Sequence, residues 1–183
     1  MCLLVVKPPG VVIPDDVIHK ACVVNPDGMG IAWHDGDKVN VVKGFFRPDD
    51  FIHLITKVRK FSAIVHWRFA THGGISRENL HPFWISDGAL GHNGIISSLD
   101  EKSGRSDTAV FVEDVLVANG LDYKGIRRNL ERLEDMIGHN RIATIHENGR
   151  TIVWNRHLWT KHGGALYSNT SAFRQAPLFW RKA

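Results

Sequence analysis

A cysteine stands directly after the initiator methionine, and a thiol at that position could serve two purposes. Cysteine is a small and often buried residue, so Cys2 could simply begin the apolar strand that residues 3–6 predict. Because a small second residue normally permits removal of Met1, Cys2 could also become the chain terminus, with a thiol and a free amine on one residue. A thiol beside a general base can act as a nucleophile.

A second residue that could do chemistry is Arg68, in the segment HWRFATHGG that ends an apolar strand. Strand alternation places Val65, Trp67 and Phe69 on one face, and His66 and Arg68 on the other. A buried arginine is costly unless an anion meets it, and a guanidinium group pairs well with a carboxylate. The residue pattern leaves open whether that carboxylate belongs to a ligand or to an aspartate of the chain.

Two further segments combine polar side chains with the ends of predicted elements. Asn93-Gly94 follows a short strand and is typical of a hairpin turn, but an amide beside a glycine N–H could also form an oxyanion hole. Asp107 in SDTAVF is most simply the N-cap of a helix, and its carboxylate could instead meet the ammonium group of a ligand.

The 11 histidines of the chain raise the question of a metal site. His66, His72, His81 and His92 are the candidates, but they lack a close ligand motif such as H-E-x-x-H. We therefore expect no metal and no cofactor. The other cysteine, Cys22, is interpreted as a buried residue on the inner face of a helix.

Together with Cys2, these segments resemble the class II glutamine amidotransferase family, whose members use an N-terminal nucleophile (Ntn). Members begin with Met-Cys and carry H-x-R-x-A-T-x-G with a downstream His-Pro, then H-N-G, then Ser/Asp-Asp-Thr. The corresponding segments in this chain, in the same order, are MC (1–2), HWRFATHG (66–73) with HP (81–82), HNG (92–94) and SDT (106–108). Among the departures, Ala109 stands where many members have glutamate.

The resemblance implies an enzyme that hydrolyses the side-chain amide of glutamine to glutamate and ammonia through a thioester intermediate. It makes Cys2 the nucleophile and the α-amine of Cys2 the general base, which requires that Met1 is removed. It makes Asn93 and Gly94 the oxyanion hole.

The same resemblance assigns the substrate contacts. Arg68, helped by Thr71 and His72, would bind the α-carboxylate of glutamine, and Asp107 would bind its α-ammonium group. The alternative is a stand-alone amidohydrolase of the same mechanism that acts on a γ-glutamyl or other small-molecule amide, because the same residues would serve both reactions.

The chain must supply strands and helices to position these residues. Apolar patterns predict strands near both ends of the chain and helices between them, which indicates an α+β layered fold. The resemblance implies more, namely a four-layer αββα Ntn-hydrolase sandwich of two antiparallel sheets flanked by helices. The predicted strands are 2–7, 29–34, 38–44, 61–70, 83–86, 88–96, 141–149, 151–155 and 164–170. The predicted helices begin near Pro14 and Pro48 and cover 108–119 and 125–138.

Length and composition bound the function. The 183 residues are expected to form one domain, 1–183, with no synthase domain attached, so that ammonia would pass to a separate synthetase or transferase. A net charge of +4 with scattered basic residues argues against a nucleic-acid partner. No apolar stretch approaches a membrane span, and two cysteines are too few for a disulfide framework, so we expect a cytoplasmic protein.

Overall fold

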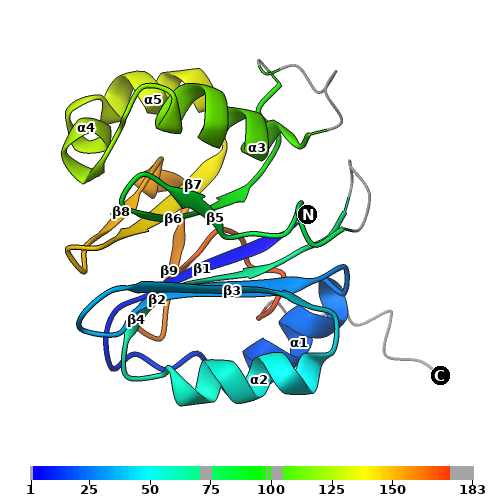
Figure 1. Ribbon diagram of the computed structural model, residues 1–183. Coiled ribbons are helices and arrows are strands. Elements are labelled where there is room, and N and C mark those ends of the chain that lie inside the picture. The colour runs from blue at the N-terminus through cyan, green and yellow to red at the C-terminus, as the bar shows by residue number, and fades with distance from the viewer. Residues whose placement is uncertain (1, 71–75, 98, 100–104, 174–183) are drawn as a thin grey trace.

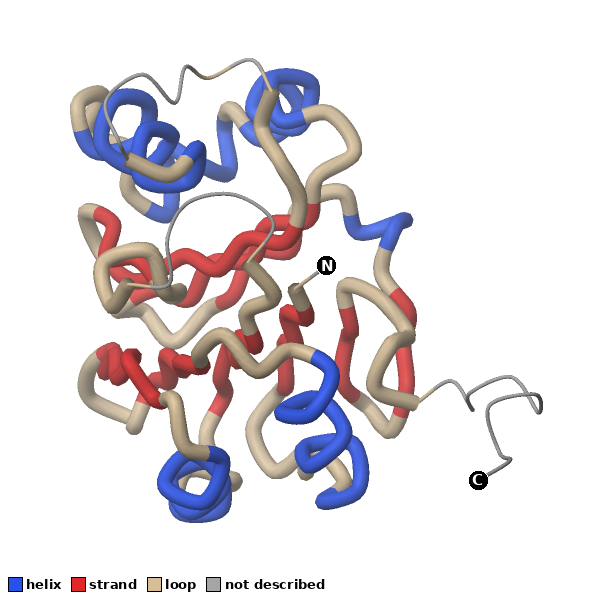
Figure 2. Tube along the Cα trace, turned by 90° about the vertical axis from the view of Figure 1, so that its right-hand side faces the viewer, coloured by secondary structure: helices blue, strands red, loops and turns tan. Residues whose placement is uncertain are grey.

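Two antiparallel β-sheets pack face to face, and helices cover the outer side of each sheet (Figure 1). The computed structural model describes residues 2–70, 76–97, 99 and 105–173. The architecture is the predicted α+β sandwich with the layer order helix, sheet, sheet, helix. Figure 2 shows the same four layers from the side.

The six-stranded sheet holds the N-terminal strand β1 (Leu3–Lys7) in its interior, between β4 and β10. All five residues of β1 are buried, because one face of the sheet meets helices and the other meets the second sheet. Its strand order is β3-β2-β4-β1-β10-β9. The remaining strands are β2 (Met29–His34), β3 (Val39–Phe45), β4 (Ser62–Trp67), β9 (Thr160–His162) and β10 (Ala165–Tyr167).

The four-stranded sheet has the order β5-β6-β7-β8. Its strands are β5 (Phe83–Ile85), β6 (Gly88–Asn93), β7 (Arg141–His146) and β8 (Thr151–Val153). The strands near both ends of the chain were therefore predicted correctly. Of the strands in the described part of the chain, only β9, three residues without an apolar pattern, was missed.

Helices α1 (Asp15–Val24) and α2 (Pro48–Lys57) cover the six-stranded sheet. Pro14 directly before α1 and Pro48 at the start of α2 correctly predicted where these helices begin. The four-stranded sheet is covered by α3 (Asp107–Val110), the π-helix η1 (Phe111–Val117), α4 (Tyr123–Arg128) and α5 (Leu130–Ile137). A short 3₁₀-helix, η2 (Arg156–Leu158), follows β8.

The two long helices predicted over 108–119 and 125–138 are each divided. The first changes from α to π geometry at Phe111, and the second is interrupted at Asn129. Asn129 ends α4, and its side-chain Nδ2 donates to the carbonyl of Gly125 at 2.8 Å. That bond satisfies a terminal carbonyl of α4, which favours a break that hydrophobic periodicity does not reveal.

Three apolar layers hold the sandwich together. One lies between α1, α2 and the six-stranded sheet, and a second between the other helices and the four-stranded sheet. The third lies between the sheets and includes Leu4 and Val6 from β1 with Ala89 from β6 and Ala143 from β7. Small residues on β6 and β7 allow β1 to approach closely, which brings the start of β1 to the end of β6.

Candidate active site

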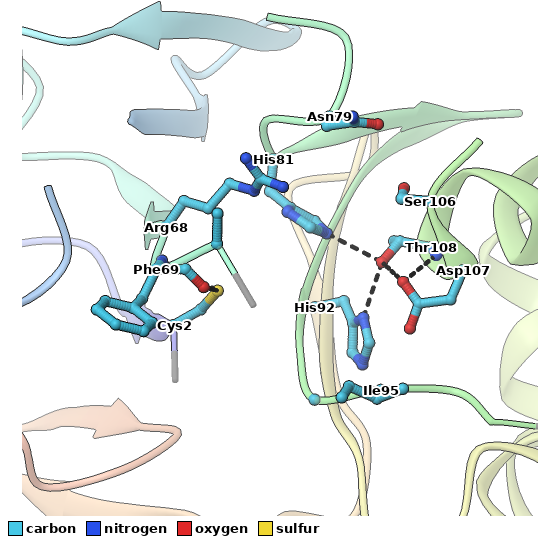
Figure 3. A pocket seen from close by; sticks show the side chains of 12 residues that line it. Cys2, Arg68, Phe69, Asn79, His81, His92, Ile95, Ser106, Asp107 and Thr108 are labelled. Carbon is cyan, nitrogen blue, oxygen red and sulfur yellow. Dashed lines mark hydrogen bonds between the residues drawn. The ribbon is translucent and has the colours of Figure 1, made fainter. Parts of the chain in front are cut away.

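A cavity of about 60 Å³ lies where β1 begins and β4 and β6 end (Figure 3). It brings together four of the seven predicted site residues, Cys2, Arg68, Gly94 and Asp107. Thr71 and His72 lie outside the described residues. The described residues that line the cavity are Cys2, Arg68, Phe69, Ala70, Asn79, His81, His92, Gly94, Ile95, Ser106, Asp107 and Thr108.

Cys2 stands directly before β1, and hydrogen bonds hold it on both sides. The backbone N–H of Phe69 donates to Cys2 Sγ at 3.4 Å, and Asn169 Nδ2 donates to the Cys2 carbonyl at 2.6 Å. Burial raises the pKa of the Cys2 thiol, while the Phe69 N–H and the charge of Arg68 act in the opposite direction. Because burial dominates, the resting thiol stays protonated at neutral pH and needs a base to become a nucleophile.

Asn93 is the last residue of β6, and Gly94 follows it into the cavity wall. The hairpin-turn interpretation of this pair is wrong, because the two strands that pair with β6 among the described residues are β5 and β7, and neither follows Gly94 directly. Asn93 is only 1% exposed, and its Nδ2 donates to Ser168 Oγ at 2.9 Å. A side-chain amide carries two N–H donors, so this bond uses only one of those of Asn93. Asn93 adjoins the cavity through Gly94 but does not itself line it.

Gly94 has a positive φ of 148°, a region that favours glycine. A Cβ added there would lie 1.7 Å from Asn140 Oδ1. Asn140 in turn interacts with the Nε2 atom of His92 at 3.0 Å and donates to the carbonyl of Ile95 at 2.9 Å. Only glycine therefore fits here, because any side chain would collide with Asn140. The backbone of Gly94 lines the cavity with no side chain of its own.

Asp107 is the first residue of α3, not its N-cap as the sequence suggested. Ser106 is the N-cap, and its hydroxyl accepts from the backbone N–H of Ala109 at 3.2 Å. The Asp107 carboxylate accepts instead from the backbone N–H groups of Ile96 and Thr108, both at 2.7 Å. These bonds fix the carboxylate at the cavity wall. Figure 3 shows Asp107 beside Thr108 at this wall.

Arg68 directly follows β4 and is 6% exposed. Two hydrogen bonds fix its backbone to the turn before β2. The Arg68 N–H donates to the Gly28 carbonyl at 2.8 Å, and the Asp27 N–H donates to the Arg68 carbonyl at 3.1 Å. The Asp27 carboxylate accepts from the backbone N–H of Ala70 at 2.7 Å. The turn that precedes β2 therefore shapes the strand end that carries Arg68.

Three buried histidines form one wall of the site. The ring centroids of His66 and His81 are 4.4 Å apart, and those of His81 and His92 are 6.2 Å apart. Thr108 Oγ1 lies 2.8 Å from His92 Nδ1 and 3.3 Å from His81 Nε2 (Figure 3). Burial lowers the pKa of each ring, so all three are neutral at pH 7. Within the described part of the chain, no group of three or more His, Cys, Asp or Glu side chains is arranged to hold a metal ion.

Sequence reasoning missed the residues whose hydrogen bonds support the site residues. Ser168 Oγ accepts from the backbone N–H of Leu4 and from Asn93, both at 2.9 Å, and so joins β1 to the end of β6. Asn169 holds the Cys2 carbonyl, and Asn140 bonds to His92 and Ile95 on the two sides of Gly94. The available signal was the polar triplet SNT at the end of the apolar strand GALY, but nothing in the sequence says which strand it meets.

Comparison with known proteins gives the family. Glutamine–fructose-6-phosphate aminotransferase (isomerizing) of Bacillus licheniformis is 36% identical over 143 residues, which cover 69% of this chain. The enzymes of the same name from Streptococcus pyogenes and Xanthomonas campestris are 33% identical over 99 residues and 38% over 79 residues. The chain belongs to the class II glutamine amidotransferase family. No family model matches the chain.

Solved structures agree with this assignment at the level of fold. A glutamine phosphoribosylpyrophosphate amidotransferase from Bacillus subtilis has a TM-score of 0.53 and 20% identity, and covers 94% of this chain. A structure described as the allosteric regulatory enzyme of purine biosynthesis has a TM-score of 0.51 at the same identity and coverage. The Ntn amidotransferase fold is thus shared with proteins of low sequence identity.

The matched regions are parts of larger relatives. The alignment covers 23% of the B. licheniformis enzyme, and the structural match covers 43% of the B. subtilis chain. Among the described residues, no helix is long and apolar enough to cross a bilayer.

Proposed function

We propose that this protein hydrolyses the side-chain amide of glutamine to glutamate and ammonia, with Cys2 as the nucleophile. The observation that carries the proposal is the shared cavity. Cys2, Arg68, Gly94 and Asp107 are scattered over the first 107 residues, yet all four line it. A thiol, a cation, an anion and a glycine N–H group in one small cavity match the carbonyl, carboxylate and ammonium groups of a free amino acid amide.

The proposed reaction begins when removal of Met1 exposes the α-amine of Cys2. The amine takes the thiol proton, and the thiolate attacks the amide carbon. The negative oxygen that forms is stabilised by the Gly94 N–H and by the second N–H of the Asn93 side chain. The proton then passes to the departing ammonia, and water hydrolyses the Cys2 thioester to release glutamate.

The charged groups in the cavity explain selection of a free amino acid. Arg68, with Thr71 and His72, binds the α-carboxylate, and Asp107 binds the α-ammonium group. Both carboxylate oxygens of Asp107 accept backbone N–H groups, which keeps the carboxylate oriented while lone pairs remain for the substrate. A glutamine residue inside a protein has neither free group and would be rejected.

The ammonia product would serve a separate enzyme. The named relatives are aminotransferases and amidotransferases, in which this domain is less than half of the chain. We propose that residues 1–183 act as one glutaminase domain and pass ammonia to a partner synthetase or transferase.

Purified protein should release ammonia from glutamine, and Cys2→Ala should lower that rate at least about a thousandfold because the covalent step is lost. Cys22→Ala is the matched control. Cys22 is the other cysteine, and it lies buried with its Sγ 3.3 Å from Trp67 Nε1 and does not line the cavity. Ammonia release should persist in this control. Retained turnover in Cys2→Ala would sink the mechanism.

Two further measurements narrow the proposal. Intact-mass analysis should show that active preparations lack Met1, because a retained Met1 blocks the α-amine. Turnover of glutamine should be compared with turnover of γ-glutamyl amides, with and without added acceptor enzymes. If another amide is hydrolysed faster than glutamine without an acceptor enzyme, that amide is the substrate and glutamine is not. Cys2 would remain the nucleophile in that case.

A further inference from the structure

A second and larger cavity, of about 520 Å³, lies at the opposite end of β1 from Cys2. Cys2 precedes β1 and lines the first cavity, whereas Lys7 ends β1 and lines the second. At about 3.3 Å per residue, the two ends of this strand are roughly 16 Å apart. The second cavity is therefore not part of the proposed glutaminase site.

The lining of this cavity is strongly basic. Among its described lining residues are five cations and no acidic side chain. The cations are Lys7, Arg127, Arg150, Arg156 and Lys161. Lys7 is buried and its Nζ donates to the carbonyls of Arg59 and Phe61, so the four exposed cations are the ones that can meet a ligand. The five cations come from β1 and β9 of the six-stranded sheet, from α4, from the turn before β8 and from η2, so only the folded chain brings them together.

These cations have no internal counter-charge. None of the five makes an ion pair of 4.0 Å or less with any described residue. Like charges gathered in one concavity repel each other and concentrate a positive field. An anion from solution that enters the cavity would relieve this repulsion.

Tyr123 adds structure to the basic wall. The guanidinium carbons of Arg127 and Arg150 each lie 5.9 Å from the centre of its ring. Arg127 Nη1 also donates to the Tyr123 hydroxyl at 3.3 Å. The phenol thus contacts two arginines of the cavity wall, and a planar guanidinium group suits bidentate binding of phosphate oxygens.

We propose that this cavity binds a small phosphate-bearing molecule. Its volume lies within the usual range for small-molecule sites, about 300–1,000 Å³. Several guanidinium and ammonium groups in one concavity match a ligand with more than one phosphate charge. A nucleic acid strand would instead need an extended basic strip, and this basic surface is a single hollow.

The test is isothermal titration of the full chain with inorganic pyrophosphate at fixed ionic strength. The native protein should bind, and the double variant Arg150→Gln/Arg156→Gln should bind at least tenfold more weakly. The matched control is Arg128→Gln. Arg128 is exposed and adjoins Arg127 in α4 but does not line the cavity, so the control should bind within twofold of the native protein.

Three outcomes would overturn the proposal. They are no pyrophosphate binding by the native protein, an equal loss in Arg128→Gln, and tighter binding of single-stranded RNA that Arg150→Gln/Arg156→Gln abolishes. Cys2→Ala should bind pyrophosphate like the native protein. Because binding is measured without turnover, failure of this proposal and failure of the glutaminase proposal are distinguishable.

Discussion

At the scale of single residues, Ser168 connects the proposed nucleophile to the proposed oxyanion hole. Its hydroxyl oxygen accepts from Leu4, two residues after Cys2, and from the Asn93 side chain. Leu4, Asn93 and Ser168 are each no more than 1% exposed, so water cannot replace these bonds. Ser168 therefore sets the distance between the start of β1 and the end of β6, and we assign it a positioning role.

Ser168→Ala should lower kcat for ammonia release about tenfold or more while KM changes little, because the Asn93 amide loses its fixed orientation. The unfolding free energy should fall by about 1–3 kcal/mol, since two buried donors lose their acceptor. Steady-state kinetics and urea unfolding measure the two effects.

Ser171→Ala is the control for this prediction. The Ser171 hydroxyl is buried and has no hydrogen-bond partner among the described residues, so its removal should change neither quantity appreciably. An unchanged kcat in Ser168→Ala would show that Asn93 does not need this contact.

At the scale of elements, the short helix α3 carries two residues of the site wall, Asp107 and Thr108. A four-residue helix has little stability of its own, so its N-cap matters. Ser106 supplies that cap, and η1 continues the chain in π geometry directly afterwards. The Ser106 cap therefore supports the first turn of α3, and the bonds from the Ile96 and Thr108 N–H groups orient the Asp107 carboxylate on that turn.

Ser106→Ala should cost about 1 kcal/mol of unfolding free energy and should also raise KM for glutamine, because the turn that carries Asp107 loses its cap. Asp122→Ala is the matched control, because Asp122 caps α4 with a 2.7 Å bond from the Gly125 N–H. That variant should lose similar stability without a change in KM. If both variants change KM equally, the effect is global and not specific to α3.

At the scale of the whole molecule, packing of the two sheets encloses His66, His81 and His92 near their contact. Burial lowers the pKa of His66 from 6.5 to about 3, and neighbouring His92 adds to the effect. The unfolded chain therefore takes up a proton near pH 6.5 that the folded chain does not take up until about pH 3. Stability is thus fully present above pH 6.5 and is lost as the pH falls toward 3.

Between pH 7 and pH 5 the unfolding free energy should fall, with each such histidine contributing up to about 1.4 kcal/mol per pH unit below its unfolded pKa. Urea unfolding at pH 7, 6 and 5 measures this slope. His66→Phe should remove the contribution of about one proton from the slope of unfolding free energy against pH. His53→Phe, at an exposed position, is the control. A slope that is unaffected by His66→Phe would mean that this ring is protonated in the folded protein.

Part of the site could be predicted because it lies in local patterns. The Met-Cys start and the segments around Arg68, Asn93 and Asp107 are short stretches whose residue types carry chemical meaning by themselves. The strands and the starts of α1 and α2 followed from apolar runs and prolines, which act over a few residues. The family assignment rested on these segments and was confirmed by the relatives.

The details that were wrong or missed depend on neighbours distant in sequence. Whether Asn93-Gly94 formed a hairpin could not be read locally, because the decisive contacts come from Asn140 and Ser168. Ser106 displaced Asp107 as the N-cap because Asp107 accepts the Ile96 N–H from another segment. The break at Asn129 also depends on a side chain that competes with the helix for a carbonyl.

The sequence by itself determined which groups are available for catalysis and in which kinds of element they lie, since residue chemistry and periodicity are local properties. Tertiary structure decided which of those groups meet. Pairing of β1 with β4 and β10, and packing of β1 on β6, bring Cys2 beside Gly94 and Arg68. The same packing gathers five cations at the other end of β1, where charges that are scattered in sequence become a single basic cavity.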